Sequence, residues 1–173
     1  MDRRTFLASA AALAASPAFA QTATAEDAKL QALFDQFFDE GLADSPEAVT
    51  RLGLDKGARA AAKSRLDDAS AAAMARERAL AVDRQTRLAA IDRAALSDHD
   101  KPNYDAVKFT SDLEVEANGR FTYGAPGAGR PYVLSQLTGA YQDIPDFLGS
   151  QHGVETTQDA EAYLSRLAAF GTV

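Results

Sequence analysis

Apolar side chains recur with the period of an α-helix near the beginning of this 173-residue chain. Acidic and amide residues occupy the opposite side, so the segment from Glu26 to about Gly41 predicts a helix that buries one stripe. The members of this stripe are Leu30, Leu33, Phe34, Phe37, Phe38 and Leu42. The same period recurs along the chain and favours a fold built only of helices.

Start and stop signals divide the middle of the chain into further elements. Ser45 and Pro46 suit the N-cap and first position of a helix that stops near Gly53. The Ala-rich stretch from Ala58 to Leu96 contains no proline. We expect it to form one long helix, or two in line, with half of its surface exposed. The sequence Ser-Asp-His-Asp at residues 97–100 interrupts this pattern.

Two more helices are predicted in the second half of the chain. Pro102 opens one that ends at Gly119, and Thr156 opens the other, with Asp159 placed to complete a capping box. Residues 119–131 are rich in Gly and Pro and predict a long loop. The apolar stripes are Tyr104, Val107, Ser111 and Val115, widened by Phe109 and Leu113, and then Ala160, Tyr163, Leu164, Leu167 and Phe170. The expected fold class is all-α, an irregular multi-helix array with a long Gly/Pro-containing loop.

The first twenty residues are typical of a bacterial export signal, with a basic start, a short apolar stretch and a small-x-small cleavage site. Its arginine pair resembles the twin-arginine (Tat) signal. The signal residues are Arg3, Arg4, Phe6 and Leu7, and the cleavage site is formed by Ala18, Ala20 and Gln21. We expect the Tat translocase and signal peptidase as partners. Residues 21–173 are then exported to the periplasm, and the signal helix is not part of the mature fold.

Two other interpretations of this segment fit less well. An amphipathic helix of the mature fold would need a polar face, which residues 6–15 lack. A membrane span would need roughly 20 apolar residues, and this run is about half as long. We therefore expect no membrane anchor after cleavage.

Charge and cysteine content exclude several classes of protein. The 18 Lys and Arg residues against 25 Asp and Glu give a net charge of −7. Because no basic cluster offsets this charge, nucleic acid and anionic membrane are not expected as partners. The chain has no cysteine, which excludes disulfides, Cys-ligated zinc, iron–sulfur clusters and thiol nucleophiles.

No catalytic motif is readable in the sequence. The two histidines, His99 and His152, lie far apart and outside any H-E-x-x-H pattern, so we expect no catalytic residue, metal site or cofactor in this chain. The acidic residues around His99 are better explained as capping groups in a loop than as ligands. The Gly-rich residues 124–129 lack the Lys and Ser/Thr of a phosphate loop.

The segment from Pro131 to Leu148 is apolar but has no steady helical period. Asp143 and Asp146 flank Ile144-Pro145, which predicts a proline-defined turn with Asp at a helix start rather than an acid–base pair. The mixture of aromatic and polar side chains fits a partly buried connection between helices, and it also fits a cleft wall. The residues of that possible cleft wall are Tyr132, Gln136, Tyr141 and Asp143.

Several strings of residues resemble a known family. They are residues 45–53, residues 131–136 continuing to 144–148, and residues 159–164. These strings resemble the N-terminal part of the DUF885 family, which is similar to helical zinc metallopeptidases and carries a His-Glu-x-x-Pro-Gly-His type motif far downstream. Nothing in this chain matches that motif. The resemblance implies a periplasmic hydrolase, acting on peptides, whose zinc would be held only by a full-length parent.

These observations leave three hypotheses. The chain is the N-terminal helical region of an exported, metallopeptidase-like hydrolase, inactive alone and packed against the remainder of its parent chain. Alternatively, it is a small periplasmic binding or interaction module without enzymatic activity, or a scaffold that only packs against its parent. The stripe of the last helix runs almost to Val173 without a later helix to cover it. We therefore expect an incomplete chain with exposed apolar surface.

Overall fold

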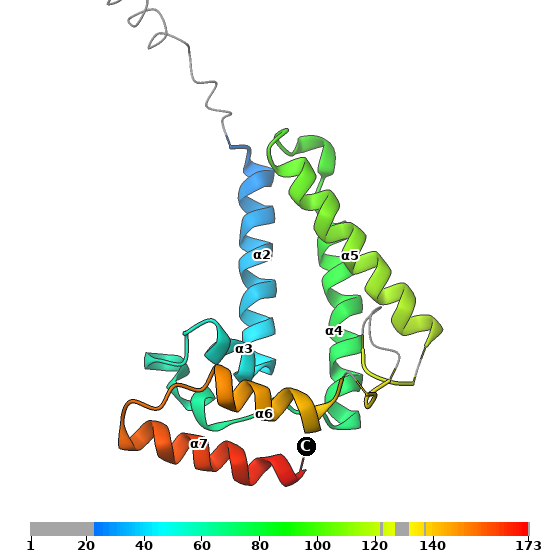
Figure 1. The fold of residues 1–173 in the computed structure, drawn as a ribbon. Coiled ribbons are helices and arrows are strands. Elements are labelled where there is room, and N and C mark those ends of the chain that lie inside the picture. The colour runs from blue at the N-terminus through cyan, green and yellow to red at the C-terminus, as the bar shows by residue number, and fades with distance from the viewer. Residues whose placement is uncertain (1–22, 122, 127–131, 137, 173) are drawn as a thin grey trace, which may run out of the picture.

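The computed structural model describes residues 23–121, 123–126, 132–136 and 138–172, and the regular elements in these ranges are all helices (Figure 1). The α-helices are α2 (Ala25–Asp44), α3 (Pro46–Arg51), α4 (Ala71–Ala89), α5 (Asp100–Arg120), α6 (Ala140–Ser150) and α7 (Thr157–Ala169). The 3-10 helices are η1 (Gly57–Ser64), η2 (Arg93–Ala95) and η3 (Phe170–Thr172). The expected all-α class is confirmed. The signal and cleavage residues 3–21, and parts of the predicted 119–131 loop, lie outside the described residues.

The first described helix, α2, begins with a capping box. The Thr24 hydroxyl oxygen accepts the Asp27 amide at 3.0 Å, and the Asp27 carboxylate accepts the Thr24 amide at 2.7 Å. The predicted stripe is buried at Leu30, Leu33 and Leu42, whereas Phe38 is exposed. The helix continues beyond Gly41, and Ser45 then serves both as its C-cap and as the N-cap of α3. The predicted short helix after Ser45 is confirmed.

Helices α2, α4 and α5 enclose the first hydrophobic core, and Figure 1 shows α2 standing beside the other two. The core consists of Leu30, Leu33, Leu88, Leu96 and Tyr104. Two buried carboxylates at the start of α2 fix the connection between α4 and α5. Glu26 accepts the Asp92 amide and Asp27 accepts the Ser97 amide, each at 2.9 Å.

The prediction of helix throughout Ala58–Leu96 is wrong in its first part and at its end, where α4 stops at Ala89. Residues 57–64 form η1, residues 65–69 have no helical structure, and α4 begins only after its N-cap Ser70. The chain leaves the helical path because the Asp67 carboxylate serves a distant segment. It accepts the Ser45 hydroxyl at 2.6 Å and the Glu47 amide at 2.9 Å. These contacts across twenty or more positions outweigh the helix propensity of the alanines.

Helix α5 begins at Asp100, two residues before the predicted start at Pro102. The Ser97 hydroxyl, rather than a side chain of residues 98–100, accepts the Asp100 amide at 3.3 Å. Of the predicted apolar face, Tyr104 is buried, while Phe109 and Leu113 are exposed.

The predicted proline turn at residues 143–146 is wrong, because these residues lie inside α6. Pro145 removes a single intrahelical donor, and its ring lies on an exposed side of the helix. The opposite side supplies Ile144, Phe147 and Leu148 to a hydrophobic core against which Tyr163 and Phe170 pack. Burial of this side holds α6 as a helix despite the proline.

The capping box predicted for α7 is confirmed. The Thr156 hydroxyl accepts the Asp159 amide at 3.2 Å, and the Asp159 carboxylate accepts the Thr156 amide at 2.8 Å. The predicted stripe is only partly covered, since Leu164 and Leu167 are exposed. The residue that α7 buries completely is Arg166.

Candidate functional site

Arg166 is 0% exposed and donates to acceptors from several segments. Its Nε donates to the Arg65 carbonyl and its Nη1 to His152 Nδ1, both at 2.8 Å. Its Nη2 donates to Thr50 Oγ1 at 2.8 Å, to the Ala62 carbonyl at 3.0 Å and to the Pro46 carbonyl at 3.5 Å. One side chain therefore joins α7 to α3, to η1, to the residue after η1 and to the α6–α7 connection.

No ion pair between Arg166 and a carboxylate forms within the described part of the chain. Burial lowers the pKa of Arg166, and the negative charges of Glu47, Asp55 and Asp67 oppose this shift from a longer range. The guanidinium also lies 4.7 Å from the centre of the Phe147 ring. Neutral acceptors and an aromatic face thus satisfy this buried cation.

His152 is 7% exposed and has a defined tautomer. Its Nδ1 must accept, because the Arg166 guanidinium has only donors. Its Nε2 lies 3.0 Å from the Asp159 carbonyl oxygen, which can only accept. In this arrangement Nδ1 accepts from Arg166 and Nε2 donates to the Asp159 carbonyl oxygen. The Tyr163 ring meets it edge-on at a centroid distance of 5.4 Å.

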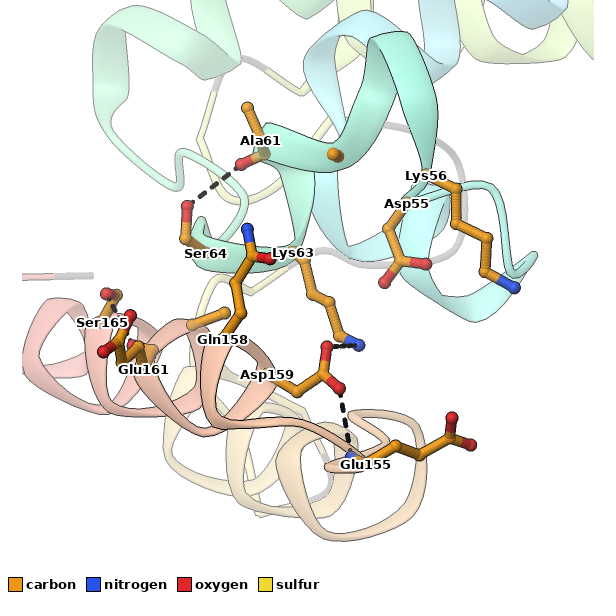
Figure 2. A pocket seen from close by; sticks show the side chains of 12 residues that line it. Asp55, Lys56, Ala61, Lys63, Ser64, Glu155, Gln158, Asp159, Glu161 and Ser165 are labelled. Atoms are coloured by element: carbon orange, nitrogen blue, oxygen red, sulfur yellow. Dashed lines mark hydrogen bonds and ion pairs between the residues drawn. The ribbon is translucent and has the colours of Figure 1, made fainter.

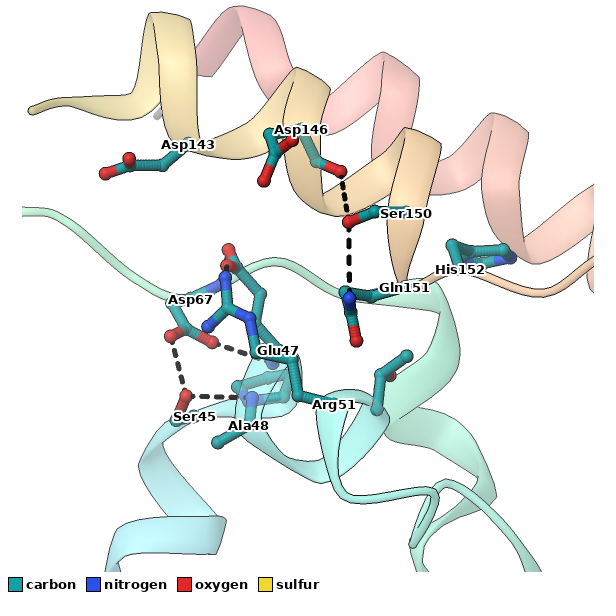
Figure 3. A network of polar contacts seen from close by, with 12 residues as sticks. Ser45, Glu47, Ala48, Arg51, Asp67, Asp143, Asp146, Ser150, Gln151 and His152 are labelled. Atoms are coloured by element: carbon teal, nitrogen blue, oxygen red, sulfur yellow. Dashed lines mark hydrogen bonds and ion pairs between the residues drawn. The ribbon is translucent and has the colours of Figure 1, made fainter. Parts of the chain in front are cut away.

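A second polar cluster adjoins this site at the start of α3, where Ser45, Glu47 and Asp67 bind one another (Figure 3). Glu47 accepts the Asp67 amide at 3.2 Å and pairs with Arg51 at 3.1 Å. Burial raises the pKa of Glu47, and the neighbouring charge of Asp67 raises it further. The Arg51 guanidinium lies 4.8 Å from the Phe147 ring centre, so Phe147 is shared by the two polar clusters.

An open hollow of about 500 Å³ lies between η1 and α7 (Figure 2). The Lys63–Asp159 ion pair joins η1 to α7 at this hollow, and the hydrogen bond from Lys63 holds the pKa of Asp159 well below its usual range. Its charged lining residues are Asp55, Lys56, Lys63, Glu155, Asp159 and Glu161, an excess of acid. The excess acid suits a cationic ligand better than an anionic one.

The hollow contains no activated nucleophile. The Ser64 hydroxyl donates to the Ala61 carbonyl at 3.1 Å, and the Ser165 hydroxyl donates to the Glu161 carbonyl at 2.9 Å. Neither serine is hydrogen-bonded to a basic side chain, which nucleophilic catalysis requires.

The residues predicted as a possible cleft wall lie before and within α6. Tyr132 and Gln136 are exposed. The Tyr141 hydroxyl donates to the Ser135 carbonyl at 2.8 Å, and the Asp143 carboxylate accepts the backbone amide four residues earlier at 3.3 Å. These residues do not line the hollow between η1 and α7, nor a smaller one of about 250 Å³ between α3 and α4. Their role in a cleft stays a prediction.

The sequence patterns do not single out Arg166, and they raise His152 only as a candidate metal ligand. One signal could have found the arginine. Arg166 lies three residues after Tyr163 and four before Phe170, and both aromatic residues pack against α6. A cation on the apolar stripe of a helix indicates a buried polar contact.

Two further observations concern the described residues alone. No three His, Asp or Glu side chains come together there in a way that could hold a metal ion. None of the described helices is long and apolar enough to cross a membrane. The zinc expected in a full-length parent stays a prediction.

Comparison with known proteins gives a family and nothing closer. No curated protein and no solved structure matches the chain significantly. The family model described as "Bacterial protein of unknown function (DUF885)" matches residues 46–173. This range contains Arg166 and all of its acceptors, from Pro46 to His152. Because the match covers well over half of the chain, this protein belongs to the DUF885 family.

Proposed function

We propose that residues 21–173 form the non-catalytic, N-terminal helical region of an exported metallopeptidase-like hydrolase of peptides. The proposal is supported by membership in DUF885 and by the resemblance of that family to helical zinc metallopeptidases. The main structural observation in its support is that the polar side chains that come together between the helices bind one another. Arg166 binds His152, Glu47 binds Asp67, and Lys63 binds Asp159. Such saturated clusters hold helices together, and their members are engaged with one another.

The exposed apolar surface supports packing against the remainder of the parent chain. Leu164 and Leu167, one turn apart on α7, are 61% and 49% exposed. Further large apolar side chains are exposed along α5, directly after its end and before α6, namely Phe109, Leu113, Phe121, Tyr123, Tyr132, Val133 and Leu134. Apolar surface of this extent is typical of a region that a further polypeptide covers.

Peptide hydrolysis by two purified proteins tests the proposal. One is this chain, and the other is the product of the uninterrupted reading frame that contains it. We expect zinc-dependent hydrolysis only by the longer protein, and no stoichiometric zinc in this chain after dialysis. Zinc-dependent hydrolysis by this chain alone would contradict the proposal, as would complete inactivity of a zinc-loaded longer protein towards peptides.

We propose export through the Tat route, on the strength of the arginine pair followed by Phe6 and Leu7. A reporter fused after residue 25 should reach the periplasm, and the double substitution Arg3→Lys and Arg4→Lys should retain it in the cytoplasm. The wild-type fusion should also be retained in a strain that lacks the Tat translocase. Equal export by that strain would assign the protein to the general secretory route.

The hollow between η1 and α7 favours a second candidate, a periplasmic binding module without enzymatic activity. A finished module covers its own apolar core, so it unfolds in one sharp transition and binds no hydrophobic dye. A region that lacks its partner should bind the dye. Thermal unfolding followed by near-ultraviolet dichroism, together with dye fluorescence, distinguishes the two.

A further inference from the structure

The hollow between η1 and α7 has walls that are fixed by contacts within the protein. Lys63 in η1 pairs with Asp159 on α7. Arg166 on α7 donates to the Ala62 carbonyl at 3.0 Å and to the Arg65 carbonyl at 2.8 Å. The volume of about 500 Å³ lies in the range of ligand sites, which are usually formed before the ligand arrives.

The polar groups that line the hollow and lack a partner of opposite kind are mainly acceptors. The Ser64 and Ser165 hydroxyls each donate their hydrogen to a carbonyl of their own helix and keep lone pairs that can accept. Three carboxylates of the lining form no ion pair within the described part of the chain, namely those of Asp55, Glu155 and Glu161. The lining therefore suits a ligand rich in donors.

The positive groups around the hollow leave this negative charge uncompensated. Lys63 is neutralised by Asp159, and the Lys56 ammonium points away from that pair (Figure 2). The positive end of the α7 dipole would favour an anion, but the Asp159 carboxylate already occupies the first turn of this helix. This carboxylate also accepts the Glu155 amide at 3.1 Å and the Thr156 amide at 2.8 Å.

We propose that the hollow binds a basic segment of a peptide, with an arginine or lysine side chain among the carboxylates of Asp55, Glu155 and Glu161. A guanidinium or ammonium group has only donors, which matches the acceptors of the lining. The methylene stem of such a side chain can lie on Ala60 and Ala162. Because the hollow is open, the peptide can continue along the surface on both sides. That this peptide is a substrate rests on the proposed function, whereas its binding does not.

A nitrogen-15 chemical-shift titration of this chain tests the binding directly. The probe is the capped pentapeptide Ala-Arg-Ala-Arg-Ala, and the matched control peptide carries Gln in place of Arg. We expect the shift changes to concentrate at residues 55–64 and 155–165 and to saturate only with the Arg peptide. Added salt should weaken the binding, because the charges that meet are close to water.

The double variant Asp55→Asn and Glu161→Gln removes two of the three unpaired carboxylates with little change of shape. An exposed ion pair contributes about threefold to affinity, so the dissociation constant of the Arg peptide should rise by about tenfold. Asp35→Asn combined with Asp146→Asn is the matched control. It removes the same charge from exposed positions on α2 and α6, outside the hollow. Its dissociation constant should stay within about twofold of the wild-type value.

Absence of saturation by the Arg peptide below about 10 mM would overturn the proposal. An equal loss of affinity in the control variant would also overturn it, because the overall charge of the protein would then explain the binding. Binding of arginine amide as tightly as the peptide would assign the hollow to a small organic cation instead.

Hydrolysis by the longer protein separates this proposal from the proposed function. Equal kcat/KM values for basic and neutral peptides would refute a role of the hollow in substrate selection and leave the hydrolase standing. Localised binding of the Arg peptide by this chain, together with an inactive longer protein, would support the binding site and refute the hydrolase.

Discussion

Replacing Arg166 with alanine tests whether this buried cation holds the C-terminal helices in place. The substitution removes the donor of five hydrogen bonds at a position that is 0% exposed. A buried acceptor left without a partner costs about 1–3 kcal/mol. The lower end applies here, because water can enter the space that the side chain leaves. The variant no longer buries a charge, and this gain offsets part of the total cost of the unsatisfied acceptors. We therefore expect the free energy of unfolding to fall by about 4 kcal/mol.

Two further substitutions separate the hydrogen bonds from the charge. Arg166→Lys keeps the charge but has three donors on one atom, so we expect a loss of about 2 kcal/mol. Arg166→Met fills most of the volume without a donor, and its cost should lie between those of the lysine and alanine variants. If the charge were the stabilising feature, methionine and alanine would cost the same.

The measurement is urea unfolding at pH 7.5, followed by far-ultraviolet dichroism with a common slope for all variants. Arg93→Met is the control, because the side chain of Arg93 is 51% exposed and its ion pair with Asp105 lies in water. Exposed ion pairs contribute little, so its midpoint should stay at the wild-type value. A loss below about 1 kcal/mol for Arg166→Ala would refute the reasoning, since a single unsatisfied acceptor should cost that much.

Two other predictions concern stability. Leu30→Ala should cost about 3 kcal/mol in the same urea assay, because Leu30 is 0% exposed in the core shared by α2, α4 and α5 and its loss leaves a cavity; an unchanged midpoint would mean that this core does not stabilise the protein. Asp159→Asn should lower the thermal midpoint at pH 7, because the Lys63 ion pair is lost. Since the pKa of Asp159 is lowered in the folded state, its contribution is fully present above about pH 4 and is lost progressively as the pH falls from there through the lowered pKa. The difference between the thermal midpoints of the wild type and Asp159→Asn should therefore narrow steadily as melts are carried out at successively lower pH below 4, and a constant difference would contradict the assigned ion pair.

Local signals predicted the helices whose ends depend on neighbouring residues. The α7 capping box needs only Thr156 and Asp159, three positions apart, and the start of α3 needs only Ser45 and the following proline. Such signals act within one turn, so they are readable in any tertiary context. The family was also recognised at this level, since strings of adjacent residues carry the resemblance that the match over residues 46–173 confirms.

The tertiary structure determined the conformation of those segments whose local preference was weak or misleading. Asp67 turns the chain away from helix because it caps α3, and the buried side of α6 keeps helical a segment that contains Pro145.

The burial of Arg166 is the clearest case of this kind. It requires the carbonyls of Pro46 and Ala62 to lie beside α7, although Pro46 is 120 positions away in the sequence. Helical periodicity determines which face of a helix is apolar, but the partner of a buried polar group comes from whichever segment the packed chain places there. The sequence by itself therefore determined the locally capped helices and the family, while only the packed chain determined the helical state of α6 and the polar site that joins the helices.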